Sequence, residues 1–147
     1  MTDSIWIQTS FHPAFKCGGW AYVRRQGAEA TGQAGGARYT TPQRMALTAL
    51  VAALKGLPPG PVAIQIAAGR PPQGEAAPTD DLDLWAQLTA ALAGRKPAFA
   101  IAQPSKAAPT GFSAAWAELA RDKANAQGAF ASAIPRPNLA KVPGLLL

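Results

Sequence analysis

Few side chains in this sequence belong to the types that perform acid–base or nucleophilic chemistry. The sole histidine, His12, lies beside Pro13 and has no acidic neighbour, so it lacks the partner that a general base needs. The sole cysteine, Cys17, follows Lys16, whose charge would favour a reactive thiolate. We expect His12 to be an exposed loop residue and Cys17 a small inert one. A single cysteine also excludes an internal disulfide.

Three aspartates lie close together at Asp80, Asp81 and Asp83. Carboxylates at this spacing could bind a cation, but they also precede an amphipathic pattern. Negative charge is favoured there by the helix dipole, so we expect these residues to cap a helix. The pair Gly35-Gly36 is not followed by the Lys-Ser/Thr of a phosphate-binding loop, so no such loop is predicted.

Hydrophobic periodicity predicts the elements that position these residues. Apolar or alternating runs indicate five strands, and apolar residues at helical spacing indicate three helices. The strands are at residues 5–9, 20–25, 28–39, 62–67 and 98–102, and the helices at 42–55, 80–93 and 113–123. Three consecutive strands therefore precede two crossover units, whose right-handed connections put helices on both faces of a mixed sheet.

Local signals mark the boundaries of several elements. Thr41 is a good N-cap for the first helix, Pro42 suits its first position, and Gly56 ends it. Gly27 is the expected turn between the second and third strands, and residues 10–19 are predicted as a loop. The four tryptophans all fall on predicted elements, where core packing is expected.

Length and composition favour one folded domain. The chain has 147 residues, of which 48% are hydrophobic and 15% charged, and this excludes a fully disordered chain. The net charge of +6 and the pI near 10.0 favour a polyanionic partner, nucleic acid first. No apolar run approaches the roughly 20 residues of a membrane span, and no basic-then-apolar leader is present. A cytoplasmic protein is the expectation.

Four short motifs, in this order, resemble those of the ribonuclease H family. They are Gly18-Gly19-Trp20, Thr40-Thr41 with Arg44-Met45 and Leu47, Asp83-Leu84-Trp85, and Glu118-Leu119-Ala120-Arg121. The resemblance covers residues 5–123. It implies an α/β fold of the RNase H-like type, with elements in the order βββαβαβα, a five-stranded mixed sheet of order 3-2-1-4-5 and helices on both faces. We expect this domain to span residues 1–124, followed by an extended, Pro-rich C-terminal tail at residues 125–147.

The resemblance also implies what the chain lacks. Family members hydrolyse the RNA strand of an RNA–DNA hybrid with two divalent metals, which four carboxylates hold against mutual repulsion. The corresponding positions here are Gln8, Ala46, Ala68 and Ala117, none of which is acidic. Losing four negative charges removes the affinity for such a metal pair. We therefore expect a pseudoenzyme that uses no metal and no other cofactor.

The start of the first helix is the predicted nucleic-acid contact. In the family, residues at this position touch the backbone of the bound hybrid. Here the candidates are Thr41, Gln43 and Arg44, with Lys16 and Arg38 completing a phosphate-binding rim. A capped helix with solvated basic residues is the competing interpretation.

Three functions remain open at this point. The first is a non-catalytic module that binds an RNA–DNA hybrid or a duplex. The second is a protein-interaction or structural domain, in which Ala46, Ala67, Ala68 and Ala117 line the former cleft and the tail, from this chain or a neighbour, fills it. The third and weakest is a metal-dependent nuclease with relocated ligands.

Overall fold

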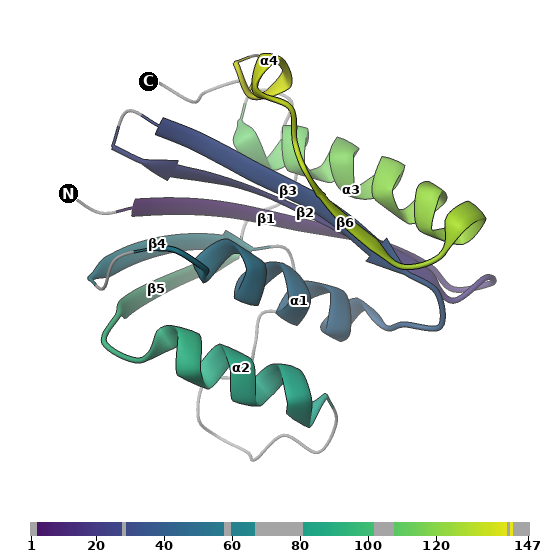
Figure 1. Ribbon diagram of the computed structural model, residues 1–147, viewed down its shortest axis with the longest axis horizontal. Coiled ribbons are helices and arrows are strands. Elements are labelled where there is room, and N and C mark those ends of the chain that lie inside the picture. Colours follow the sequence, from purple (N-terminus) through teal and green to yellow (C-terminus); the bar gives the residue numbers. More distant parts are fainter. Residues whose placement is uncertain are drawn as a thin grey trace.

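The computed structural model describes residues 3–27, 29–57, 60–66, 81–101, 108–140 and 142. Its centre is one six-stranded sheet of strand order β5-β4-β1-β2-β3-β6 (Figure 1). The strands are β1 (Asp3–His12), β2 (Cys17–Gln26), β3 (Glu29–Ala37), β4 (Pro61–Ile66), β5 (Lys96–Ile101) and β6 (Phe130–Ala133). The helices are α1 (Pro42–Leu54), α2 (Leu82–Leu92), α3 (Pro109–Gln127) and α4 (Arg136–Leu139).

The sheet is mixed, as the order of elements predicts. β1 pairs with β2, β2 with β3, and β3 with β6, all antiparallel, whereas β1–β4 and β4–β5 are parallel. The predicted order 3-2-1-4-5 is confirmed for the first five strands, and β6 adds one strand at the β3 edge. β1 lies between an antiparallel and a parallel neighbour, so its residues are central to the molecule.

Two hydrophobic cores cover the two faces of the sheet. The core on the first face holds Ile5 and Ile7 of β1 with the apolar sides of α1 and α2. The core on the opposite face holds Ala21 and Val23 of β2 with α3 and the segment after β6. Alternation along each strand sends neighbouring side chains to opposite cores. Helices therefore lie on both faces, as predicted (Figure 1).

The local chemistry of α1 is as the sequence predicts. The N-cap is Thr41, whose side-chain oxygen accepts a hydrogen bond from the Arg44 N–H, and Pro42 begins the helix. The helix ends at Leu54, and Gly56 then takes a positive φ of 78°. That conformation favours glycine and turns the chain towards β4.

The loop predicted at residues 10–19 is mostly strand. β1 and β2 form a hairpin whose pairing continues to His12 opposite Cys17, so only residues 13–16 form the turn. The sequence did not signal this extension because Gly18 and Gly19 are poor strand formers.

Those glycines are explained by the helix above them. A Cβ on Gly19 would overlap the Ala117 carbonyl oxygen and the Arg121 backbone of α3. A Cβ on Gly36 of β3 would come within 2.9 Å of the Ala124 Cβ and 3.0 Å of the Ala120 carbonyl oxygen, also on α3. Glycines in the sheet therefore let α3 lie with its backbone almost directly on the strands.

The region after residue 125 contains regular structure that the predicted extended tail did not include. α3 continues to Gln127, four residues beyond its predicted end, and Gly128 ends it with a φ of 92°. β6 then pairs with β3, and Ile134, Leu139 and Val142 are buried in the core beneath α3. Where the independently folding unit ends stays a prediction. No helix in the described part of the chain is both long and apolar enough to span a membrane.

Candidate nucleic-acid interface

Gln8 and Ala117, two of the residues predicted to replace the family's carboxylates, lie together on the α3 face of the sheet. Ser113 donates a hydrogen bond to the Trp6 carbonyl at 3.2 Å, and Arg121 donates one to the Ser10 hydroxyl at 2.9 Å. Four residues of a helix and two residues of a strand each rise by about 6 Å along their axes. Successive turns of α3 therefore stay level with every second residue of β1. Ala117, midway between Ser113 and Arg121, therefore lies at the level of Gln8, midway between Trp6 and Ser10.

Both residues are enclosed by the protein. Ala117 is 0% exposed and Gln8 is 2% exposed. Ala46 is also buried, but it belongs to the other core, beneath α1. Ala46 and Ala117 therefore belong to different cores, and their lining of one groove with Ala67 and Ala68 stays a prediction. Ala67 and Ala68 lie outside the described residues.

The donor chemistry at these positions does not fit a pair of divalent cations. One amide and two methyl groups provide no anionic oxygen, and hard cations require several. Within the described ranges, no three His, Cys, Asp or Glu side chains gather where they could hold a metal ion.

The start of α1 is held to the start of α2 by a forked ion pair. Arg44 contacts Asp81 at 3.1 Å through Nη1 and Asp83 at 2.9 Å through Nη2. The hydrogen bonds to Asp83 and Asp81 raise the pKa of Arg44, and the hydrogen bond from Arg44 lowers the pKa of Asp83. The Gln43 amide lies 3.5 Å from the Asp81 carboxylate. Much of the positive charge predicted here is therefore balanced inside the protein.

Asp81 does not cap α2 in the way that the sequence suggested. It occupies the N-cap position, but its side chain makes no cap hydrogen bond and its φ is 57°. Its carboxylate binds Arg44 instead. Asp80 lies outside the described residues.

The segments that carry Lys16 and Arg38 meet where the β1–β2 hairpin contacts the entry to α1. The Thr40 N–H donates a hydrogen bond to the Lys16 carbonyl at 3.0 Å, which joins the two segments. The Arg38 guanidinium donates to the carbonyls of Asn125 and Ala126 at the end of α3, yet the residue remains exposed. Lys16 is exposed and forms no ion pair with any residue in the described ranges.

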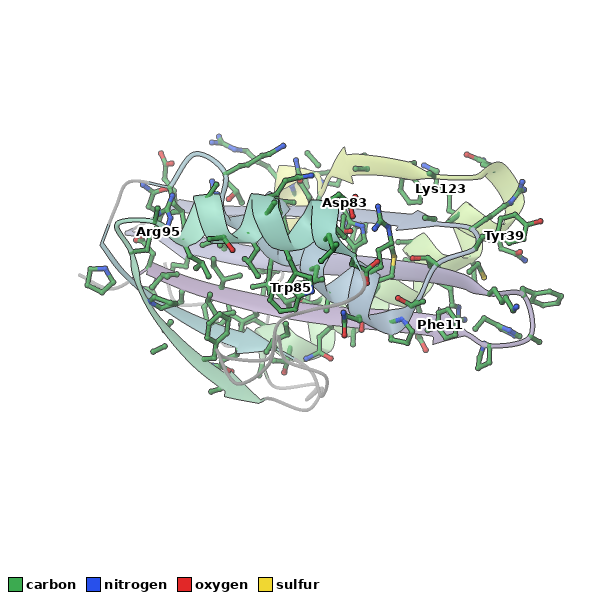
Figure 2. The ribbon with its side chains drawn as sticks, turned by 90° about the horizontal axis from the view of Figure 1, so that it is seen from below. Phe11, Tyr39, Asp83, Trp85, Arg95 and Lys123 are labelled. Carbon is green, nitrogen blue, oxygen red and sulfur yellow. The ribbon has the colours of Figure 1, made fainter. Side chains whose placement is uncertain are left out.

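Two exposed aromatic residues adjoin these cations, and the sequence analysis did not identify them. Phe15 is 60% exposed and Tyr39 is 88% exposed. Figure 2 shows Tyr39 projecting from the end of the molecule opposite Arg95. We call Phe15, Lys16, Arg38 and Tyr39 the hairpin-end surface. The missed signal was the adjacency of an aromatic and a basic residue in both Phe15-Lys16 and Arg38-Tyr39.

The backbone holds this surface in an unusual conformation. Lys16 and Tyr39 both have a φ of 52°, which is uncommon for residues with a Cβ. His12 lies on the same hairpin, with its ring centroid 4.6 Å from that of Phe15, and is half-buried rather than exposed. Cys17 is buried in β2, in keeping with an inert thiol.

Comparisons with known proteins give structural matches only. No protein-family model matches the chain, and no curated protein matches it by sequence. The chain resembles the crystal structure of LC9-RNase H1, described as a type 1 RNase H with the type 2 active-site motif. The TM-score is 0.64 at 14% identity, over 95% of this chain and 79% of that one. It also resembles the N-terminal RNase H domain of rv2228c from Mycobacterium tuberculosis, with a TM-score of 0.62 at 17% identity, over 86% of this chain and 96% of that one. The protein therefore has a ribonuclease H-like fold.

Proposed function

We propose that this protein is a non-catalytic nucleic-acid-binding module that takes an RNA–DNA hybrid or a duplex. The hairpin-end surface is the observation that carries the proposal. It combines two cations, Lys16 and Arg38, with two exposed rings, Phe15 and Tyr39. Cations bind phosphates, and aromatic rings pack on bases and sugars, so the four residues suit one ligand.

Thr41 extends this surface towards the start of α1. It is exposed, and its hydroxyl oxygen already accepts the Arg44 N–H. The hydroxyl hydrogen can still be donated to a phosphate oxygen, since a hydroxyl is both donor and acceptor. Gln43 and Arg44 lie further along, where Asp81 and Asp83 offset the charge, and we assign them a smaller part.

The absence of catalysis is the second part of the proposal. It is supported by the neutral, buried side chains of Gln8, Ala46 and Ala117, which replace carboxylates in the family pattern. A two-metal mechanism needs anionic ligands to hold the cations and position the attacking water. We infer that a bound hybrid stays intact.

Fluorescence anisotropy tests the binding. A labelled RNA–DNA hybrid and a DNA duplex of the same sequence are titrated at about 50 and 200 mM salt, a range over which phosphate-driven affinity falls steeply. Lys16→Gln should weaken binding to both and reduce the salt slope by about one. Tyr39→Ala should weaken binding by about 1 kcal/mol or more, the scale of one aromatic contact.

Lys55→Gln is the matched control. Lys55 is exposed and follows the opposite end of α1, so its loss changes the net charge equally without touching the hairpin-end surface. Equal effects of Lys16→Gln and Lys55→Gln would show that only overall charge matters. No binding of either nucleic acid at 50 mM salt would refute the proposal, because screening is then mild.

A further inference from the structure

A second candidate site lies beside the C-terminal half of α1, away from the start of that helix. It is a cavity of about 570 Å³ bounded by β2, β3, β6, α1 and α2. This volume falls within the range of about 300–1,000 Å³ that is usual for small-ligand sites. None of the five residues proposed from the sequence to contact nucleic acid lines it.

Aromatic rings form one wall of this cavity. Trp20 and Tyr22 lie on the same face of β2 with their rings parallel to within 3° and their centroids 6.3 Å apart. Val51 and Ala52 of α1 and Leu84 of α2 add apolar surface. Trp20 and Tyr22 are 3% and 4% exposed, so a flat, apolar ligand ring would meet only the small part of their surface that faces the cavity.

The charge of the lining is entirely positive. Arg24 and Lys55 contribute two cations, and none of the described residues that line the cavity is an aspartate or glutamate. Arg24 is fixed in place because its Nη1 donates to the Ala53 carbonyl at 2.9 Å and to the Lys55 carbonyl at 2.7 Å. Two positive charges without an acid favour a negatively charged ligand.

Polar groups with unused hydrogen-bonding capacity complete the lining. The Trp20 indole, the Tyr22 hydroxyl and the amides of Gln33 and Gln87 have no hydrogen-bond partner in the described part of the chain. Burial raises the pKa of Tyr22, so its hydroxyl remains protonated and able to donate at neutral pH. The Arg24 Nε–H is buried and also lacks a partner there.

The Nε–H of Arg24 bears on the geometry of the anion. Nε and Nη2 form one edge of a guanidinium, and that edge binds a carboxylate through two parallel hydrogen bonds. Nη1 is occupied by the carbonyls at the end of α1, so the Nε–Nη2 edge is the part of the guanidinium left for a carboxylate. Nε is buried, so a ligand reaches this edge only if the Arg24 side chain moves. A planar carboxylate matches it better than a spherical anion does.

We propose that this cavity binds a small aromatic carboxylate, with its ring against Trp20 and Tyr22 and its carboxylate at Arg24 and Lys55. None of Phe15, Lys16, Arg38 and Tyr39 lines the cavity, so this site is separate from the hairpin-end surface. Its occupancy and the nucleic-acid affinity can be measured independently.

The probe is naphthalene-2-carboxylate, compared with its neutral isostere naphthalene-2-carboxamide. Both are titrated into the full-length, ¹⁵N-labelled protein and followed by amide shifts in NMR. We expect the carboxylate to bind at least tenfold more tightly than the carboxamide. The largest shifts should fall on β2, β6 and the C-terminal half of α1.

Gln87→Glu provides the decisive variant, because it adds an acid to the lining at an exposed position of α2 that tolerates the change. It should weaken binding of the carboxylate at least tenfold and leave the carboxamide unchanged. Gln127→Glu, exposed at the end of α3 on the other face, is the control and should have no effect. Arg24→Gln is less suitable because it also removes the contacts at the end of α1.

Three results with the unmodified protein would overturn the proposal. They are equal affinity for carboxylate and carboxamide, shifts that map outside the cavity, and no binding at millimolar probe. Loss of binding in both glutamate variants would point to overall charge and would likewise overturn it.

Discussion

Arginine side chains in this protein bind the carbonyl ends of helices. Arg24 donates to the last carbonyls of α1, Arg38 to those of α3, and Arg95 to carbonyls of both α1 and α2. A helix C-terminus carries unpaired carbonyls and partial negative charge, so a guanidinium stabilises it. Part of the positive charge that the sequence suggested for a polyanion therefore has a structural use.

The Arg44 fork should make the stability of the protein depend weakly on pH. Asp83 is exposed, and its bond to Arg44 lowers its pKa below the ordinary value of 3.8 (Figure 2). A lowered pKa in the folded state contributes stability that is present above pH 4 and is lost as the pH falls through the folded-state pKa. Asp83→Asn should lower the melting temperature slightly at pH 6, and the difference should vanish near pH 2.

Thermal unfolding of the two proteins between pH 2 and 6 measures this. Glu118→Gln, an exposed position on α3 outside any described ion pair, is the control and should leave the curve unchanged. A melting-temperature difference for Asp83→Asn that stays constant down to pH 2 would contradict the assignment.

The two glycines at the start of β2 should differ in their tolerance of a methyl group. Gly19→Ala puts its Cβ into the backbone of α3, which cannot move without shifting the helix, so we expect a loss of about 3 kcal/mol or more. Gly18→Ala meets side-chain atoms only, the Met45 Cγ and the Thr40 Cγ2, which can shift more easily than a helix backbone, so a smaller loss of about 1–2 kcal/mol is expected. Urea unfolding of both variants measures the difference. Equal losses would show that α3 is not seated on Gly19.

At the scale of elements, β6 and α4 close the second core. Ile134 and Leu139 lie on Gly32, and a Cβ at Gly32 would come within 3.1 and 3.2 Å of their side chains. The sequence did not reveal this role, because residues 130–133 carry no apolar alternation and their partner strand is distant in the chain. Non-local pairing of this kind depends on an edge that exists only once β3 has formed.

Truncation of a buried side chain tests this closure. Leu139 is 5% exposed, so Leu139→Ala should cost about 2–5 kcal/mol of unfolding free energy. Leu119→Ala makes the same change at a residue that is 62% exposed on α3 and should cost about 0.5 kcal/mol or less. A loss for Leu139→Ala no larger than this control would mean that the segment after β6 is not part of the core.

Sequence reasoning succeeded where the deciding interaction is local. The Thr41 cap, the helix it starts and the turn at Gly27 each depend on a few neighbouring residues, and all are present. It was incomplete where distant segments meet. Tyr39 is exposed on a left-handed backbone, and the Arg44 fork depends on α2 reaching α1, neither of which periodicity encodes.

At the scale of the whole molecule, the fold and the proposed loss of catalysis rest on different observations. The six-stranded sheet and its two cores place this chain among ribonuclease H-like structures. The side chains at the positions of the family's carboxylates underlie the proposal that it binds without cutting. Among the described residues, the hairpin-end surface offers two cations, and one of them, Arg38, also binds the carbonyls at the end of α3, so the proposed binding should be of modest affinity.

Binding of a hybrid and the absence of its cleavage can be tested together in one native gel. An RNA–DNA hybrid, end-labelled on its RNA strand, is incubated with the protein and Mn²⁺ at about 50 mM salt, where phosphate contacts are weakly screened. We predict a slower band that returns full-length RNA when the protein is removed. Shortened RNA would contradict the proposed loss of catalysis, and an unshifted hybrid would contradict the proposed binding.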